Sequence, residues 1–134
     1  MIREITIGSR VVGDEHPTYF IADIAANHDG QLQRALELIH SAKEAGADAA
    51  KFQYFQASKI VSDYGFKNMG SRQAHQSPWK KSVFEVYQDY SISQDWTPYL
   101  KAECDKVGID YFSSPYDFDS VDHLDPYVDV YKIG

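Results

Sequence analysis

Two lysines in apolar runs are candidates for binding an anionic ligand. Lys51 lies within residues 49–54, and Lys132 lies within residues 128–133. Both runs are apolar enough to form buried strands, and burying a lysine without an anionic partner is costly. Lysine binds phosphate and carboxylate groups as a compact point charge. The pattern therefore predicts a site where both ammonium groups face one small anionic molecule.

Asp23 is the acidic residue best suited to chemistry in this sequence. It lies inside the apolar run 19–26, where an unpaired carboxylate is hard to tolerate. Its carboxylate can accept hydrogen bonds from a sugar hydroxyl or take part in proton transfer. An ion pair between Asp23 and Lys51 across adjacent strands would satisfy both charges without any ligand. A catalytic role and a structural ion pair both remain open at this point.

Further polar residues occur at the ends of the apolar runs. Gln53 follows Lys51 by two positions, so both side chains face the same side of an extended strand. Ser114 ends another apolar run, and Asn27 and His28 directly precede a helical pattern. Asparagine is also common at such positions because it caps helices. We expect these residues to line a binding site, with local capping as the alternative for Asn27 and His28.

The composition of the 134 residues narrows the classes of function. The formal net charge is −7 without a basic run, which argues against nucleic acid and anionic membranes as partners. No apolar run approaches the roughly 20 residues of a membrane-spanning helix, and no secretory leader is evident, so we expect a cytoplasmic protein. Cys104 is the only cysteine and lies in a helical pattern, so an inert, buried thiol is expected. The histidines lack ligand spacing, and no metal site is predicted.

Periodicity predicts alternating strands and helices. A hairpin is expected over residues 2–13, around Gly8-Ser9. Strands are expected over 19–26, 49–54, 109–114 and 128–133, the first of them covered on both faces. Helices are expected over 31–45, 81–90, 93–107 and 120–124. The segment 56–78 is expected to be a long loop.

This alternation is typical of right-handed parallel β/α units. It predicts an α/β fold over residues 1–134, namely the N-terminal half of a TIM-type (β/α)8 barrel preceded by a short β-hairpin. A flavodoxin-like doubly wound sheet is the competing architecture. The polar residues cluster toward the carboxyl ends of the expected strands, where barrels carry their active sites, and this favours the barrel.

Three segments resemble the bacterial N-acetylneuraminate (sialic acid) synthase family: residues 21–30, 42–53 and 111–117, with 131–134 continuing the match. Legionaminate, pseudaminate and spore-coat polysaccharide synthases are similar. The resemblance implies a (β/α)8 barrel joined to a C-terminal antifreeze-like domain, which condenses phosphoenolpyruvate with N-acetylmannosamine and releases phosphate. It also implies Mn²⁺ or Mg²⁺ as cofactor. The metal-binding histidines, the second half-barrel and the antifreeze-like domain have no counterpart in these residues.

The resemblance also implies roles for individual residues. Lys51 and Lys132 would contact phosphoenolpyruvate, while Gln53 would reach the amino sugar and Ser114 would line the same mouth. Asp23 occupies a position that is usually glutamate. Its shorter side chain displaces the carboxylate by about 1 Å, and such a displacement can remove much of a catalytic contribution.

Three functional hypotheses follow. The first is a nonulosonate synthase, of which these 134 residues alone are expected to be inactive. The second is a non-catalytic half-barrel that binds small anions or self-assembles, and unpaired strand edges lead us to expect a homodimer. The third is a phosphoenolpyruvate-dependent synthase of a 3-deoxy sugar phosphate. Asn27-His28 and Lys51-Phe52-Gln53 favour the sialic acid type over this third class.

Overall fold

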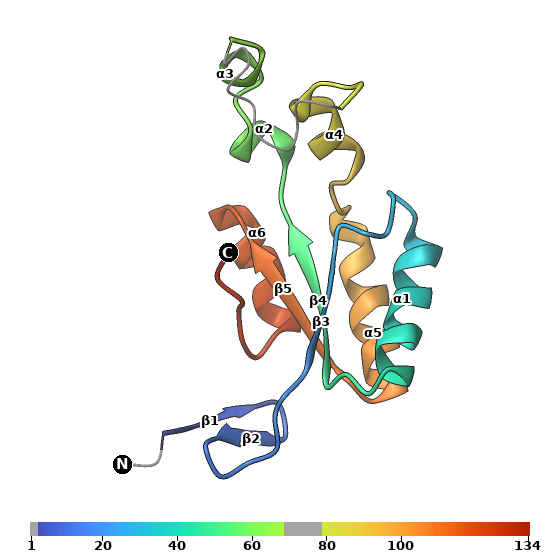
Figure 1. Cartoon of the computed structure of the whole chain (residues 1–134), viewed down its shortest axis with the longest axis vertical. Coiled ribbons are helices and arrows are strands. Elements are labelled where there is room, and N and C mark those ends of the chain that lie inside the picture. The colour runs from blue at the N-terminus through green and yellow to red at the C-terminus, as the bar shows by residue number, and fades with distance from the viewer. Residues whose placement is uncertain (1–2, 69–78) are drawn as a thin grey trace.

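The computed structural model describes residues 3–68 and 79–134, which form an α/β fold that begins with a hairpin (Figure 1). Strands β1 (Glu4–Ile7) and β2 (Arg10–Gly13) pair antiparallel. Gly8 adopts a φ of +56° in the turn between them, a conformation that glycine reaches without steric cost. The predicted hairpin is therefore confirmed.

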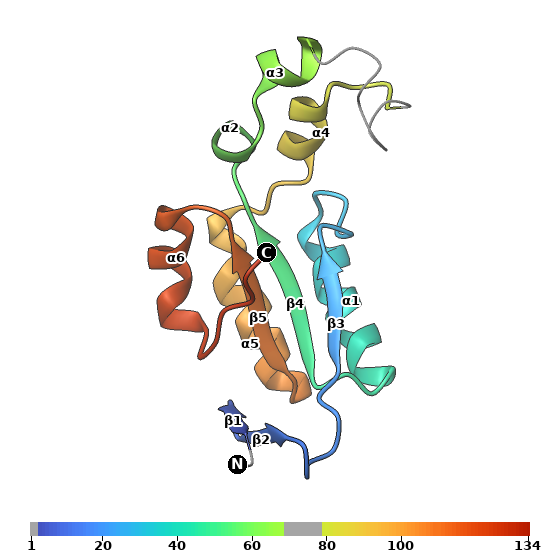
Figure 2. The same ribbon diagram turned by 60° about the vertical axis from the view of Figure 1, so that its left-hand side comes forward.

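Three parallel strands form the sheet that carries the candidate site. They are β3 (Ile21–Ala25), β4 (Ala49–Tyr54) and β5 (Asp110–Pro115), with β4 in the centre. Figures 1 and 2 show the hairpin at the amino ends of these strands and further short helices beyond their carboxyl ends. Parallel pairing brings all three carboxyl ends to one edge of the sheet.

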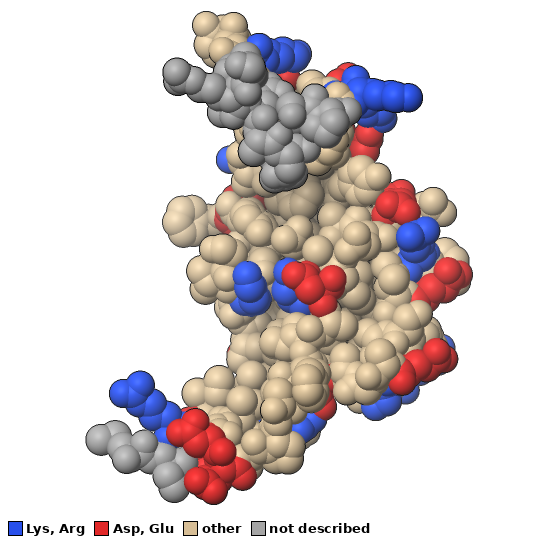
Figure 3. Space-filling view, viewed as in Figure 1, with Lys and Arg blue, Asp and Glu red and all other residues tan. Residues whose placement is uncertain are grey.

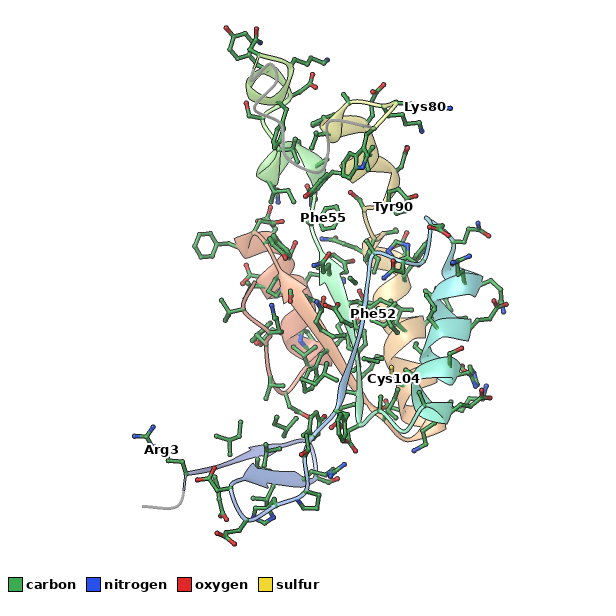
Figure 4. The ribbon with its side chains drawn as sticks, in the orientation of Figure 1. Arg3, Phe52, Phe55, Lys80, Tyr90 and Cys104 are labelled. Carbon is green, nitrogen blue, oxygen red and sulfur yellow. The ribbon has the colours of Figure 1, made fainter. Side chains whose placement is uncertain are left out.

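Helices cover one face of this sheet (Figure 2). These are α1 (Leu32–Glu44), α5 (Thr97–Val107) and α6 (Phe118–Leu124), with the 3-10 turns η2 (Gln94–Trp96) and η3 (Asp125–Tyr127) before α5 and after α6. Ile39 of α1 and Leu100 of α5 share a buried cluster with Phe52 of β4. Cys104 lies in the same cluster, as predicted, and burial raises the pKa of its thiol to about 12 (Figure 4).

The hairpin packs against the amino end of the opposite face. Ile7 of β1 is buried in a cluster with Ala49 of β4 and Phe112 of β5. Arg10 forms an ion pair with Asp48, and the Tyr19 hydroxyl donates a hydrogen bond to the carboxylate of the residue that begins β5. The hairpin therefore closes the amino end of this face, while the carboxyl end lies away from it.

The segment after β4 differs from the predicted loop. In its described part it folds into α2 (Ala57–Ile60) and α3 (Asp63–Asn68), while residues 69–78 lie outside the described residues. Helices of four and six residues are too short to show a clear period in the sequence. Helix α4 (Val83–Asp89) follows the predicted 81–90 and starts with a capping box between Ser82 and Glu85.

Two strand predictions need correction. Strand β3 lies at the edge of the sheet, so Phe20 and Ile21 are exposed rather than covered on both faces. Residues 128–133 form no strand. The backbone N–H of Lys132 donates to the Ser113 carbonyl oxygen over 3.3 Å, but a parallel ladder requires evenly repeated bonds. The sheet of the described residues thus has three parallel strands, which is consistent with part of a half-barrel.

Candidate functional site

The pleat of β4 and β5 places polar side chains on the face opposite the helices. Phe52 packs into the helix-side cluster, so its neighbours Lys51 and Gln53 point to the other face. Phe112 packs beneath them against the hairpin cluster, and Ser114, two residues later, lies on the same side. Lys51 and Gln53 thus share one face with Ser114, above an apolar layer.

Lys51 and Asp23 form an ion pair across β3 and β4. The two residues face each other in register, and Lys51 Nζ lies 2.7 Å from Asp23 Oδ1. The lysine side chain is only 5% exposed, whereas the aspartate side chain is 66% exposed. The ion pair that the sequence offered as an alternative to a catalytic role is therefore present. Its carboxylate faces solvent, so a ligand can approach the pair from the side of Asp23.

A β-bulge distorts β3 immediately after Asp23. The register with β4 shifts between Asp23 and Ala25, and Ala25 adopts a φ of +51°. A non-glycine residue in this left-handed region is uncommon, and bulges frequently occur beside active sites, where they redirect a side chain. Asn27 supports the turn through a hydrogen bond from Nδ2 to the Ile24 carbonyl oxygen at 2.9 Å.

Gln53 and Ser114 lie opposite each other in the pairing of β4 with β5, two residues beyond Lys51 toward the carboxyl ends of the strands. Gln53 Nε2 donates to the Tyr116 hydroxyl oxygen at 3.4 Å. Ser114 is fully buried, and within residues 3–68 and 79–134 its hydroxyl has no hydrogen-bond partner. Lys132 is exposed, with its backbone held beside Ser113. The structure thus gathers Gln53 and Ser114 on adjacent strands and places the chain of Lys132 next to them.

His28 lies inside the protein on the helix side. Its Nδ1 accepts the Gly30 backbone N–H at 3.1 Å, which leaves the proton of the neutral ring on Nε2. Its ring meets that of Trp96 edge-on, with centroids 5.3 Å apart, and burial lowers the pKa of the imidazole. In the described part of the chain Nε2 finds no hydrogen-bond partner. This placement indicates that His28 shapes the loop after β3, because a ligand on the polar face cannot reach a fully buried ring.

The sequence reasoning missed an aromatic pocket beside Gln53. A cavity of about 310 Å³ lies between the carboxyl ends of β4 and β5 and the short helices. Its lining residues are Gln53, Phe55, Ile60, Val61, Phe66, Tyr87 and Tyr116. The sequence contained an indication of this pocket. Phe55 lies two positions after Gln53, and Tyr116 lies two positions after Ser114, so both aromatic residues continue the polar face of their strands.

Lys59 connects helix α2 to the start of α6. Its Nζ lies 2.8 Å from Asp117 Oδ1 and 2.6 Å from Asp119 Oδ2. Asp117 also caps α6 by accepting the Ser120 backbone N–H. This ion-pair network holds the segment after β4 against the segment after β5.

Charged side chains are few over the middle of the sheet. Figure 3 shows a small group of basic and acidic side chains over the strands, within a largely uncharged surface. Across the described ranges, no three His, Cys, Asp or Glu residues are grouped closely enough to hold a metal ion. The same ranges contain no helix that is long and apolar enough to cross a membrane.

Comparison with known proteins decides the family. The NeuB family profile matches residues 38–134. The chain belongs to the NeuB family. The resemblance to sialic acid synthases is thereby confirmed.

This NeuB-family chain is 32% identical over 117 residues to the N,N'-diacetyllegionaminic acid synthase of Legionella pneumophila. The aligned region covers 87% of the chain and 32% of that protein. It is 33% identical over 126 residues to the human N-acetylneuraminate-9-phosphate synthase, which covers 93% of the chain and 34% of that protein. The chain therefore spans about a third of these relatives.

Solved structures agree with this assignment. The NeuB-family chain matches the N-acetylneuraminic acid synthetase of Leptospira borgpetersenii in complex with citrate, with a TM-score of 0.78 and 27% identity over 99% of the chain and 41% of that structure. A truncated 3-deoxy-D-arabino-heptulosonate 7-phosphate synthase from Thermotoga maritima has a TM-score of 0.59 at 14% identity, covering 98% of the chain and 36% of that structure, which shows likeness of fold alone. Both are barrel synthases, so the partial sheet is consistent with half of a barrel.

Proposed function

We propose that this chain supplies half of the active site of a nonulosonic acid synthase built on a TIM-type barrel. The reaction is the condensation of phosphoenolpyruvate with N-acetylmannosamine or a related amino sugar. The observation that carries the proposal is the alignment of Lys51, Gln53 and Ser114 on one face of adjacent parallel strands in a NeuB-family chain. Barrels place their chemistry at this end of the strands.

The chemistry requires anion binding and proton transfer. The methylene carbon of phosphoenolpyruvate forms a bond to the aldehyde carbon of the open-chain sugar, and the aldehyde oxygen takes up a proton. Water then adds to the former enol carbon, and its bond to the phosphate oxygen breaks to release phosphate. Lys51 and Lys132 would hold the phosphate and carboxylate groups, since ammonium groups stabilise such anions.

Asp23 and the amide and hydroxyl groups would position the sugar. The exposed carboxylate of Asp23 can accept a hydroxyl proton or a hydrogen bond while it remains paired to Lys51. Gln53 would bind the amide of the sugar, and Ser114, which is fully buried beside Gln53, would support the position of that side chain without contacting the sugar. Asn27 and His28 would act by fixing the loop after β3.

The proposal includes partners and a cofactor. Mn²⁺ or Mg²⁺, when bound to the synthase, would polarise the aldehyde oxygen. The described residues contain no cluster of three His, Cys, Asp or Glu side chains that could hold this ion, so we assign none of them to the metal. Exposed Phe20 and Ile21 at the edge of the sheet favour association with a second copy of the chain. We retain a cytoplasmic location, without nucleic acid or membrane partners.

A non-catalytic anion-binding half-barrel is the second candidate. The ion pair between Lys51 and Asp23 favours it, because the charges are already satisfied without substrate. Under this alternative, the chain would bind phosphate or phosphoenolpyruvate weakly and turn over neither. Direct binding without product formation would distinguish this candidate from a synthase.

A condensation assay tests the proposed function. The natural polypeptide that carries these 134 residues is incubated with phosphoenolpyruvate, Mn²⁺ and either N-acetylmannosamine or arabinose 5-phosphate, and both released phosphate and product mass are measured. The proposal expects product with the N-acetylated sugar. Product with arabinose 5-phosphate alone would assign the chain to the 3-deoxy sugar phosphate class instead.

A further inference from the structure

A polar network links the sheet to the helices that cover it. Thr97, the first residue of α5, is fully buried, and its Oγ1 donates to the hydroxyl oxygen of Tyr54 at 3.3 Å. His123 of α6 contacts the same Oγ1 through Nε2 at 3.0 Å. The network thereby joins α5, α6 and the last residue of β4, beside the apolar cluster of the helix side.

The hydrogen bonds of this network have a defined direction. The Thr97 hydroxyl has one proton, which it donates to Tyr54, so Nε2 of His123 is the donor in the contact with Thr97. Burial raises the pKa of Tyr54 to about 12, so its hydroxyl stays neutral at physiological pH. The imidazole also packs against the Tyr54 ring, with centroids 5.5 Å apart. His123 therefore holds Tyr54 both by ring packing and through the Thr97 hydroxyl.

Tyr54 connects this network to the polar face of the sheet. It directly follows Gln53 in β4, and its carbonyl oxygen accepts the Tyr116 backbone N–H at 3.0 Å. The Tyr116 hydroxyl in turn accepts a hydrogen bond from Gln53 Nε2 at 3.4 Å. Gln53, Tyr54 and Tyr116 thus form a closed cycle of covalent and hydrogen bonds. The hydroxyl of Tyr54 links that cycle to α5 and α6.

Hydroxyl groups are not required to fill this part of the interior. Valine and phenylalanine have nearly the shapes of threonine and tyrosine, and they would fill the same space without the cost of burying a hydroxyl group. Hydrogen bonds are directional, so a buried polar network holds its members in one arrangement more strictly than apolar contacts do. The contacts of Thr97 and His123 converge on the carboxyl end of β4, next to Gln53. The network therefore restricts the position of this strand end.

We propose that His123 is a positioning residue that fixes the side chain of Gln53 from the opposite side of the sheet, without touching the ligand. The inference rests on the proposed function, in which Gln53 binds the amino sugar. Lys51 lies two residues earlier in β4 and is held by Asp23, so the anion site does not depend on this network. Loss of the network should therefore weaken sugar binding and leave phosphoenolpyruvate binding unchanged.

Substitutions in the natural polypeptide separate the ring of His123 from its N–H donor. His123→Phe keeps an aromatic ring and removes the donor, whereas His123→Gln keeps an N–H donor and removes the ring. We expect KM for N-acetylmannosamine to rise about two- to tenfold in His123→Phe, as for one lost hydrogen bond, while kcat and KM for phosphoenolpyruvate change less than about twofold. His123→Gln should restore KM for the sugar to within about twofold of the parent. His16→Phe is the matched control, because His16 pairs with Glu4 of the hairpin, at the opposite end of the strands.

A spectroscopic measurement tests the positioning role without turnover. The side-chain amide of Gln53 gives a pair of ¹H–¹⁵N NMR signals, which Gln53→Glu identifies by removing them. We expect these signals to shift in His123→Phe and to stay in place in His16→Phe. Thr97→Val removes the bridging hydroxyl at similar volume and should shift the same signals. It replaces His123→Phe in both measurements if that variant fails to fold.

The outcomes separate this inference from the proposed function. Gln53 signals that stay in place in both His123→Phe and Thr97→Val overturn the positioning role, even when condensation occurs. A fall in kcat with both KM values unchanged would show a purely structural role and also overturn it, as would a KM for the sugar as high in His123→Gln as in His123→Phe. If no sugar condenses, the proposed function fails, while a shift of the Gln53 signals in both variants still supports His123 as the positioning residue.

Discussion

The ammonium of Lys51 is buried while the carboxylate that pairs with it, on Asp23, is exposed. The two atoms lie 2.7 Å apart across β3 and β4. A buried cation requires an anion nearby, whereas an exposed carboxylate requires no partner. The pair therefore depends on Asp23 for stability and keeps one side open toward a ligand.

Asp23→Asn and Lys51→Met should differ in their effect on stability. Asp23→Asn leaves the buried ammonium without its anion and is expected to lower the free energy of unfolding by about 1–2 kcal/mol, less than for a fully buried pair because solvent reaches Asp23. Lys51→Met replaces the charged side chain by an apolar one of similar volume. It is expected to change the free energy of unfolding by less than about 1 kcal/mol. Urea denaturation measures both. Equal losses of unfolding free energy in the two variants would contradict a stabilising effect of Asp23 on the buried ammonium.

Ala25→Gly should relieve backbone strain in the bulge of β3. A left-handed alanine costs roughly 1–2 kcal/mol, partly offset by the greater flexibility of glycine in the unfolded chain. We expect thermal unfolding to show a net gain of up to about 1 kcal/mol. Ala26→Gly is the control, since Ala26 is not among the residues with positive φ, and it should lose about 0.5–1 kcal/mol. A loss at both positions would contradict a strained Ala25.

Gly8→Ala should weaken the packing of the hairpin against the start of β5. A Cβ at Gly8 would lie 2.8 Å from Asp110 Oδ1, the residue that also accepts the Tyr19 hydroxyl. Gly46→Ala is a matched control, because Gly46 also has a positive φ but has no atom within 4 Å of such a Cβ. We expect about 1–2 kcal/mol of strain in both variants and a further loss at Gly8 alone. Chemical denaturation yielding equal losses would contradict the steric contact.

The buried imidazole of His28 should make stability depend on pH. Burial lowers its pKa below the ordinary 6.5. As pH falls through 6.5, the unfolded chain therefore binds a proton that the folded chain does not, and stability declines until the folded pKa is reached. The decline is at most about 1.4 kcal/mol per pH unit. Urea denaturation from neutral to mildly acidic pH should show a shallower decline in His28→Gln, and identical slopes would contradict this assignment.

The sequence predicted the elements in which burial follows a clear period. Residues 49–54 form β4 as expected, because the alternation of Lys51 and Gln53 with Phe52 matches a strand with one polar face. Helix α1 matches the expected 31–45 within a residue at each end, and Gly46 follows it with a φ of +84°. The pairing of Lys51 with Asp23 was one of two readings that the sequence left open, because opposite charges at register positions of adjacent strands attract each other.

The remaining features depend on contacts between distant residues. The β-branched residues in 128–133 match a strand, but whether Lys132 pairs repeatedly with β5 depends on chain geometry that local pattern does not encode. His28 lies in a run of turn-forming residues, and its burial against Trp96 results from packing across 68 positions. The pocket around Phe55 likewise forms only when the short helices fold back over β4.

Isothermal titration calorimetry of phosphoenolpyruvate with the natural polypeptide shows whether Lys51 binds the anion. The parent is compared with Lys51→Met and with Lys106→Met, which removes an exposed lysine of α5 outside the site. We predict at least about a tenfold weaker affinity for Lys51→Met, since a charge-assisted contact contributes about 1.5–3 kcal/mol, and no change for Lys106→Met. Equal affinity in all three proteins would contradict the assignment of the anion site to Lys51.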